Sequence, residues 1–189
     1  LNELKIKNPN VQLRINTNLS KTDTCIFDLI CGFKNVHWIV SVEAMDKEYE
    51  YIRYGGKWKD FLENLDVITK LNHKISFNML YFCLNYLSIF DTLDFLLNKG
   101  YHPNSFIIGA LLTPDYLNIR HLPNNMLNLA LEQIQTRLNS KSGFLYENGL
   151  QNILDYMQQP IIKNVDAMKT GLMTLDQRRN LNSKNIFKN

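Results

Sequence analysis

The chain has 189 residues, of which 45% are apolar and 21% are charged. This length suffices for one domain with a hydrophobic core and a small extension, and the composition is ordinary for a globular protein. Lys and Arg number 21 against 18 Asp and Glu, so the net charge of +3 does not indicate nucleic-acid binding. No apolar run approaches the length of a membrane span, and we expect no membrane association.

The cysteines and the polar first ten residues indicate a reducing compartment. Cys25, Cys31 and Cys83 make an odd number, and "LNELKIKNPN" has no signal-peptide character. We therefore expect a cytoplasmic protein without disulfides. Because the chain starts with Leu1 and stops at "NIFKN", we also expect it to be a fragment of a longer protein.

Strands and helices are expected to alternate through the first 112 residues. "VQLRIN" (11–16), "VHWIVSV" (36–42), "KISFNMLYF" (74–82) and "SFIIGALL" (105–112) have the composition of strands. Helices are expected over 23–33, 57–71 and 87–99, the first capped by Asn18, Ser20 or Thr22 and ended by Gly32. A polar loop is expected between residue 42 and the helix at 57–71.

This β-α-β-α-β-α-β order predicts an α/β fold with a parallel sheet. The strands are nearly continuous apolar runs, as expected when both faces of a sheet are covered, so the sheet is either open or closed into a barrel. After Pro123 the pattern becomes helical, with helices expected over about 124–138, 145–158 and 161–174.

Polar residues follow the strands at the edge where parallel α/β folds bind ligands. They are Thr17 and Asn18 after the first strand, Ser41 and Glu43 after the second, Arg53 in the loop beyond, Asn78 on the third and the 111–114 segment after the fourth. Arg53 suits a carboxylate, because a guanidinium donates two parallel hydrogen bonds, and Glu43 or Asn78 suits ribose hydroxyls.

A structural interpretation of the same residues is at least as well supported by spacing alone. Ser41 and Asn78 then satisfy backbone groups at strand ends, and Arg53 pairs with Glu48 or Glu50 on the surface. The cysteines are better explained as core residues than as metal ligands. The four histidines form no metal-binding spacing and are expected to be structural.

Several segments together resemble radical S-adenosylmethionine (SAM) enzymes, in particular the twitch- or SPASM-related group. They are "LRINTN", "IVSVE…EYEYIRYGGKWKDFLENL", "KISFNML" and "LTPDYLNIRHLPNN", within residues 10–125, and the closing "DQRRN" is also similar. The most specific piece is the strand ending in Ser-x-acidic, followed by Tyr-Ile-Arg-Tyr and a Trp-bearing helix.

The resemblance implies a partial (β/α) TIM-like barrel over 1–122 and a helical C-terminal extension over 123–189. It implies a [4Fe-4S] cluster and SAM at the carboxyl-end mouth, an electron donor, and a 5′-deoxyadenosyl radical that abstracts hydrogen from a small-molecule or peptide substrate. By position, Ser41 and Glu43 face SAM, Arg53 binds its carboxylate, Asn78 reaches its ribose or methionine portion, and Leu111 packs near adenine. Thr17 and Asn18 match the family's "TNG", with Leu19 in place of the glycine.

One departure from the family is severe. The C-x3-C-x2-C cluster loop is absent from the sequence, so we expect the cluster ligands upstream and this fragment to be inactive alone. Two other hypotheses stay open: a nucleotide-sugar-binding α/β transferase that uses Glu43 and Arg53, and a non-catalytic domain that binds a partner through its helical tail.

Overall fold

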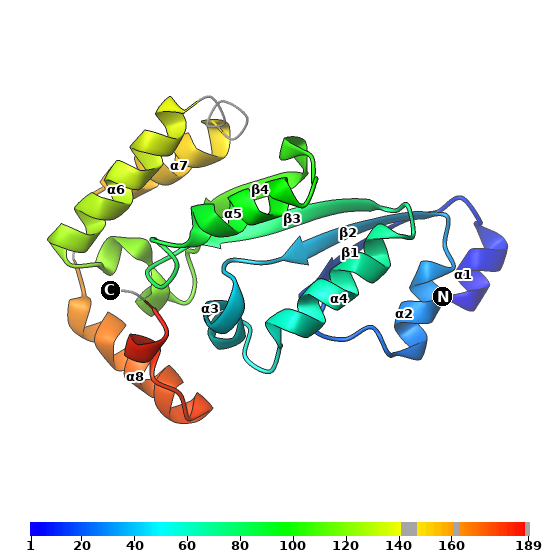
Figure 1. Ribbon diagram of the computed structural model, residues 1–189, viewed down its shortest axis with the longest axis horizontal. Helices are drawn as coiled ribbons and strands as arrows, with labels where there is room; N and C mark the ends of the chain where they lie inside the picture. Colours follow the sequence, from blue (N-terminus) through cyan, green and yellow to red (C-terminus); the bar gives the residue numbers. More distant parts are fainter. Residues whose placement is uncertain (141–146, 161–162, 188–189) are drawn as a thin grey trace. The chain divides into compact units, whose positions relative to one another are not determined.

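The computed structural model describes residues 1–140, 147–160 and 163–187 (Figure 1). The chain divides into two compact units, Leu1–Asn78 and Met79–Asn189. The boundary expected between residues 122 and 123 thus falls inside the second unit. None of the helices in these residues combines the length and the apolar character that a membrane crossing requires.

Unit 1 contains two complete strands, the start of a third and four helices. The elements are α1 (Asn2–Lys7), β1 (Gln12–Thr17), α2 (Cys25–Cys31), β2 (Asn35–Ser41), α3 (Asp46–Ile52), α4 (Trp58–Thr69) and the start of β3 (Lys74–Tyr81). Thr24 caps α2, because its side-chain oxygen accepts a hydrogen bond from the backbone N–H of Phe27. The cap expected at residue 18, 20 or 22 was therefore placed too early, whereas the end at Gly32 is confirmed.

The strands form a four-stranded parallel sheet in the order β1-β2-β3-β4. In the β1–β2 ladder Arg14 pairs with His37, and in the β2–β3 ladder His37 pairs with Lys74 and Ser41 with Asn78. The α/β class and the parallel sheet predicted from the sequence are confirmed. The TIM-like barrel stays a prediction.

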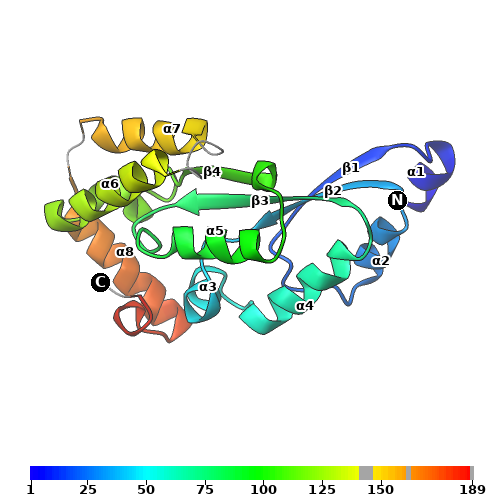
Figure 2. The same ribbon diagram turned by 45° about the horizontal axis from the view of Figure 1, so that its top comes forward.

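In unit 1, α2 and α4 lie on one side of the sheet. In Figure 2, β1 and β2 run along one side while α2 and α4 lie together on the other. The ring of Phe27 on α2 lies 5.6 Å from that of Trp38 on β2. Val40 and Phe77, paired across β2 and β3, are completely buried. Since side chains alternate between faces, the row Trp38–Val40 forms the core-facing side of β2.

The other face of the unit 1 sheet is polar. On β1, Gln12, Arg14 and Asn16 are exposed, while the residues between them are half-buried. On β2, His37, Ile39 and Ser41 point to this face, because they alternate with Trp38 and Val40. Parallel sheets are usually apolar on both faces, so this polar face is a departure from the common pattern.

Unit 2 begins within β3 and is mainly helical. It contains α5 (Ile89–Asn98), β4 (Phe106–Ala110), α6 (Asn124–Asn139), α7 (Glu147–Gln158) and α8 (Val165–Arg179). Short 3-10 turns lie at Pro103–Ser105, Asp115–Leu117, Ile119–His121 and Ser183–Asn185. The described residues after Pro123 contain helices and turns but no strand, as the sequence predicted; positions 145, 146, 161 and 162 of the predicted helices lie outside the described residues.

Specific contacts join α8 to the turns that follow β4. His121 is buried; its Nδ1 accepts a hydrogen bond from the Asn164 backbone N–H, so its Nε2 donates to Asp115 at 2.9 Å. Gly171 lies against the ring of Tyr116, where an added Cβ would come within 2.4 Å of the ring carbons. The C-terminal helix is therefore fitted to this turn by a polar contact and by close packing.

Two elements of unit 1 were not expected from the sequence. Residues 46–52, predicted as part of a polar loop, form the helix α3, and the short α1 precedes the first strand. Both are only one or two turns long, too short for an apolar stripe to reveal a helix.

Candidate functional site

Five of the seven predicted site residues lie at or beyond the carboxyl ends of β1 and β2 in unit 1, and a sixth, Asn78, lies within β3. Thr17 is the last residue of β1 and Ser41 the last of β2, and Asn78 is the cross-strand partner of Ser41. Glu43 and Arg53 follow β2, on either side of α3. The parallel direction of the strands brings these positions to one edge of the sheet.

The turn after β1 is built by its own side chains. Thr17 Oγ1 accepts a hydrogen bond from the Leu19 N–H at 3.0 Å, and Asn18 Oδ1 accepts one from the Ser20 N–H at 3.1 Å. Leu19 has φ of +51°, a left-handed conformation that favours glycine, and its side chain is buried. The residue that replaces the glycine of "TNG" thus keeps the backbone conformation for which glycine is suited, and Thr17 and Asn18 shape the turn.

Ser41 and Asn78 lie side by side on the polar face of the sheet. The Asn78 carbonyl accepts a hydrogen bond from the Val42 N–H at 3.2 Å, which continues the β2–β3 ladder beyond Ser41. Both residues are partly exposed, and neither side chain forms a hydrogen bond with the part of the chain that the structure describes. Within that part, the interpretation that they satisfy backbone groups is wrong, and a hydroxyl and an amide are available to a ligand.

Glu43 and Arg53 form a two-point ion pair. Arg53 Nε donates to Glu43 Oε2 at 2.8 Å, and Arg53 Nη2 donates to Oε1. The Glu43 side chain is 2% exposed and that of Arg53 is 26% exposed. Arg53 therefore pairs with the residue predicted to share its site; Glu50, one of its two predicted surface partners, forms an ion pair with Lys57 at 2.9 Å.

Burial dominates the ionisation of Glu43. Removal from water raises the pKa of its carboxyl group, and the hydrogen bonds and positive charge of Arg53 oppose this increase. The pair holds Arg53 by one edge of its guanidinium. Nη1 forms no hydrogen bond with the described residues, so the other edge of Arg53 can still donate to an anion.

Helix α3 and a glycine turn position Arg53. The Arg53 backbone N–H donates to the Tyr49 carbonyl at 2.7 Å, and the Tyr49 hydroxyl donates to the Asn18 carbonyl at 3.0 Å. Burial raises the pKa of Tyr49 to about 12, so this hydroxyl keeps its proton at neutral pH. Gly55 has φ of +90°, and a Cβ on Gly56 would come within 3.3 Å of the Tyr49 hydroxyl. Both glycines of "YGGK" are therefore explained by the turn.

Tyr49 is the residue of this site that sequence reasoning missed. It joins the loop after β1 to the helix that carries Arg53, and it is completely buried. Its position four residues before Arg53 is a helical spacing, but this signal is readable only once residues 46–52 are taken as a helix.

Leu111, the seventh predicted residue, belongs to unit 2. It follows β4, and its backbone N–H donates to the Tyr81 carbonyl at 3.0 Å. Its side chain is half-buried. The predicted contact with adenine stays a prediction.

The histidines have structural contacts, as expected. His73 accepts a hydrogen bond from Trp38 Nε1 and contacts the Phe33 carbonyl, and His102 caps a 3-10 turn. Among the residues that the structure describes, no group of three or more His, Cys, Asp or Glu side chains could hold a metal ion.

The cysteines were expected in the core, and this is right for only one of them. Cys83 is buried, whereas Cys25 is exposed and Cys31 is intermediate. Burial raises the pKa of the Cys83 thiol to about 12. Cys25 and Cys31 are the first and last residues of α2, and Cys83 belongs to unit 2. Within the described residues the three thiols are not part of a group that could hold a metal ion.

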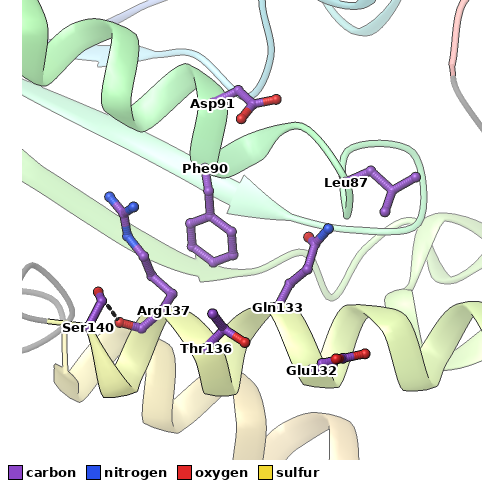
Figure 3. Close-up of a pocket in the computed structure, with 8 residues that line it drawn as sticks. All are labelled: Leu87, Phe90, Asp91, Glu132, Gln133, Thr136, Arg137 and Ser140. Atoms are coloured by element: carbon purple, nitrogen blue, oxygen red, sulfur yellow. Dashed lines mark hydrogen bonds between the residues drawn. The ribbon is translucent and has the colours of Figure 1, made fainter.

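A separate pocket of about 410 Å³ lies between α5 and α6 in unit 2 (Figure 3). Its wall includes Arg137, which forms a two-point ion pair with Asp94 at 2.5 and 3.1 Å and lies over the ring of Phe90. Asp91 and Glu132 also line it, and they give part of the wall a negative charge. None of the predicted site residues lines this pocket, and it was not expected from the sequence.

Comparisons with known proteins do not identify the chain. No protein-family model, no curated protein and no solved structure matches it.

Proposed function

We propose that the carboxyl-end site of unit 1 binds SAM, and that the chain is part of a radical SAM enzyme. The observation that carries the proposal is the buried Glu43–Arg53 pair, which leaves one edge of Arg53 without a partner among the described residues. The sequential strand order β1-β2-β3-β4 is that of a barrel wall, which is why we also propose the TIM-like barrel.

The residues at the site suit the polar parts of SAM. The remaining N–H groups of Arg53 can donate to the carboxylate of SAM, while Glu43 holds the guanidinium in place. The Ser41 hydroxyl and the Asn78 amide can exchange hydrogen bonds with ribose hydroxyls. Thr17 and Asn18 contribute by forming the turn after β1. The Asn18 carbonyl in this turn also accepts a hydrogen bond from the Tyr49 hydroxyl.

The described residues do not suit a [4Fe-4S] cluster. Such a cluster needs several thiolates close together, whereas Cys25 and Cys31 lie at opposite ends of α2 and Cys83 belongs to unit 2. Under the proposal the cluster ligands belong to a segment outside this chain, and the chain contributes SAM binding. Bound SAM supplies the chemistry of hydrogen abstraction from a small-molecule or peptide substrate, and an electron donor is required.

The test is calorimetric titration of the purified chain with SAM. We expect binding that Arg53→Ala weakens at least about ten-fold, since a hydrogen bond to a charged group contributes about 1.5–3 kcal/mol. Ser41→Ala and Asn78→Ala each remove one partly exposed polar group, so they test the site with little risk to folding. Arg137→Ala removes an ion-paired arginine from unit 2 and serves as the control.

Three outcomes would contradict the proposal. SAM affinity that is equal in the wild type and in all three site variants would remove these residues from the site. Thermal stabilisation by a nucleotide sugar without any SAM binding would support the transferase hypothesis, and the absence of both would support a non-catalytic domain.

A further inference from the structure

A row of three basic residues crosses the polar face of the unit 1 sheet. Arg14 on β1 pairs with His37 on β2, and His37 pairs with Lys74 on β3. Directly paired residues point to the same face, and neighbouring strands are about 4.8 Å apart. The three side chains therefore start from adjacent positions on one level of the sheet.

No acidic side chain of the described residues compensates this row. Neither Arg14 nor Lys74 forms an ion pair with the part of the chain that the structure describes, and both are exposed. Arg14 and Lys74 lie on either side of His37, so an anion bound over His37 would lie between their two positive charges.

His37 and Ser76 together provide one free hydrogen-bond donor in either tautomer of the histidine. His37 Nε2 lies 2.8 Å from Ser76 Oγ, and both residues are buried. If the Ser76 hydroxyl donates to Nε2, the proton of the neutral ring is on Nδ1 and is free to donate. If Nε2 donates instead, the Ser76 hydroxyl proton is free. Burial and the charges of Lys74 and Arg14 lower the pKa of His37, as expected at a level of the sheet that lacks negative charge.

We propose that Arg14, His37, Lys74 and Ser76 form a binding site for the phosphate group of a small phosphate monoester. Two positive charges match the charge of about −1.5 to −2 that a monoester carries at pH 7, whereas a carboxylate would leave one cation uncompensated. The guanidinium of Arg14 fits the tetrahedral oxygens by two parallel hydrogen bonds, and Lys74 adds a point charge.

This site is distinct from the proposed SAM site and does not depend on it. Both lie on the same face, because Ser41 is four positions after His37 on one strand. That separation corresponds to about 13 Å along β2. A phosphorylated small molecule held here would extend along the face toward Ser41 and Asn78.

The test is a titration of the chain with inorganic phosphate at constant ionic strength, observed by NMR of the histidine Cε1–H groups. We expect the His37 signal, assigned by its loss in His37→Gln, to shift saturably and its pKa to rise. The exposed His102 reports general salt effects and is expected to stay unchanged. The same titration with glucose 6-phosphate, and with glucose as its control, then tests whether the site accepts a phosphate monoester or only the free ion.

Variants decide whether the basic row is responsible. Arg14→Gln with Lys74→Gln should weaken phosphate binding at least ten-fold, and folding is expected to persist because both side chains are exposed. Lys70→Gln, an exposed lysine beyond α4, is the matched control. A His37 shift no larger than that of His102, or equal phosphate affinity in the double variant, would overturn the proposal. Unchanged phosphate binding in Arg53→Ala would show that the phosphate site is independent of the proposed SAM site, so that a failure of SAM binding would not count against it.

Discussion

Removal of Arg53 should destabilise unit 1 by an amount that depends on pH. The side chain of Glu43 is 2% exposed, and Arg53→Ala leaves this carboxylate buried without its two charge-assisted hydrogen bonds. Breaking a buried pair in this way typically costs about 3–5 kcal/mol. Because Arg53 itself is 26% exposed and its charge is partly screened, we expect a loss near the lower limit, about 3 kcal/mol, at pH 7.5.

The pH dependence follows from the direction of the Glu43 pKa. Burial raises this pKa in the folded state and Arg53 opposes the increase, so Arg53→Ala should raise it further. A raised folded-state pKa contributes stability below the unfolded-state pKa, and this contribution is lost as pH rises. The loss caused by Arg53→Ala should therefore be smaller at pH 5 than at pH 7.5, by at least about 1 kcal/mol.

Urea unfolding followed by tryptophan fluorescence reports on the stability of unit 1. The chain has 2 tryptophans, Trp38 and Trp58, and both lie in unit 1. Glu43→Gln combined with Arg53→Ala should recover at least about 1 kcal/mol relative to Arg53→Ala alone, because the buried charge that has lost its Arg53 hydrogen bonds is removed. Lys57→Ala, which breaks the more exposed pair with Glu50, should change little. A loss below about 0.5 kcal/mol that is equal at both pH values would refute this reasoning.

Two further predictions concern glycine packing and thiol reactivity. Gly171→Ala should destabilise unit 2 by about 1–3 kcal/mol in urea unfolding followed by circular dichroism, because its Cβ would come within 2.4 Å of the Tyr116 ring. Gly109→Ala, which has open space around the added Cβ, should change stability much less, and equal losses would contradict the packing argument. A thiol reagent at pH 8 should modify the exposed Cys25 well before Cys83, whose pKa burial raises to about 12; equal rates in mass-spectrometric time courses would show that Cys83 is accessible.

The long periodic segments were predictable because the spacing of their apolar residues shows which face of the helix is buried. In helix α4, four of the six apolar residues at helical spacing are buried, namely Trp58, Phe61, Leu65 and Ile68, while Leu62 and Leu71 are half-buried. Helix α3 was missed because seven residues with four charges show no comparable stripe, although Tyr49 within it is buried.

The positions of the candidate site residues were predictable, but their pairing was not. Strand direction in a parallel sheet places Ser41 and Asn78 toward the same end of the sheet, and the register shows that they are partners. Glu43 and Arg53 are ten residues apart across a helix that was not expected, so nothing in their spacing indicated a two-point ion pair. That contact depends on how α3 turns back toward the end of β2.

By itself, the sequence determined the α/β class, the parallel strands, most helix positions and the polar edge of the sheet, because periodicity and residue type depend on local surroundings. Only the tertiary structure decided which polar groups are bound to each other and which are available. It pairs Glu43 with Arg53, leaves the side chains of Ser41 and Asn78 without hydrogen bonds among the described residues, and aligns Arg14, His37 and Lys74 in one row. The physical reason is that hydrogen bonds and ion pairs depend on distances between segments far apart in the chain, which strand register and helix packing fix only on folding.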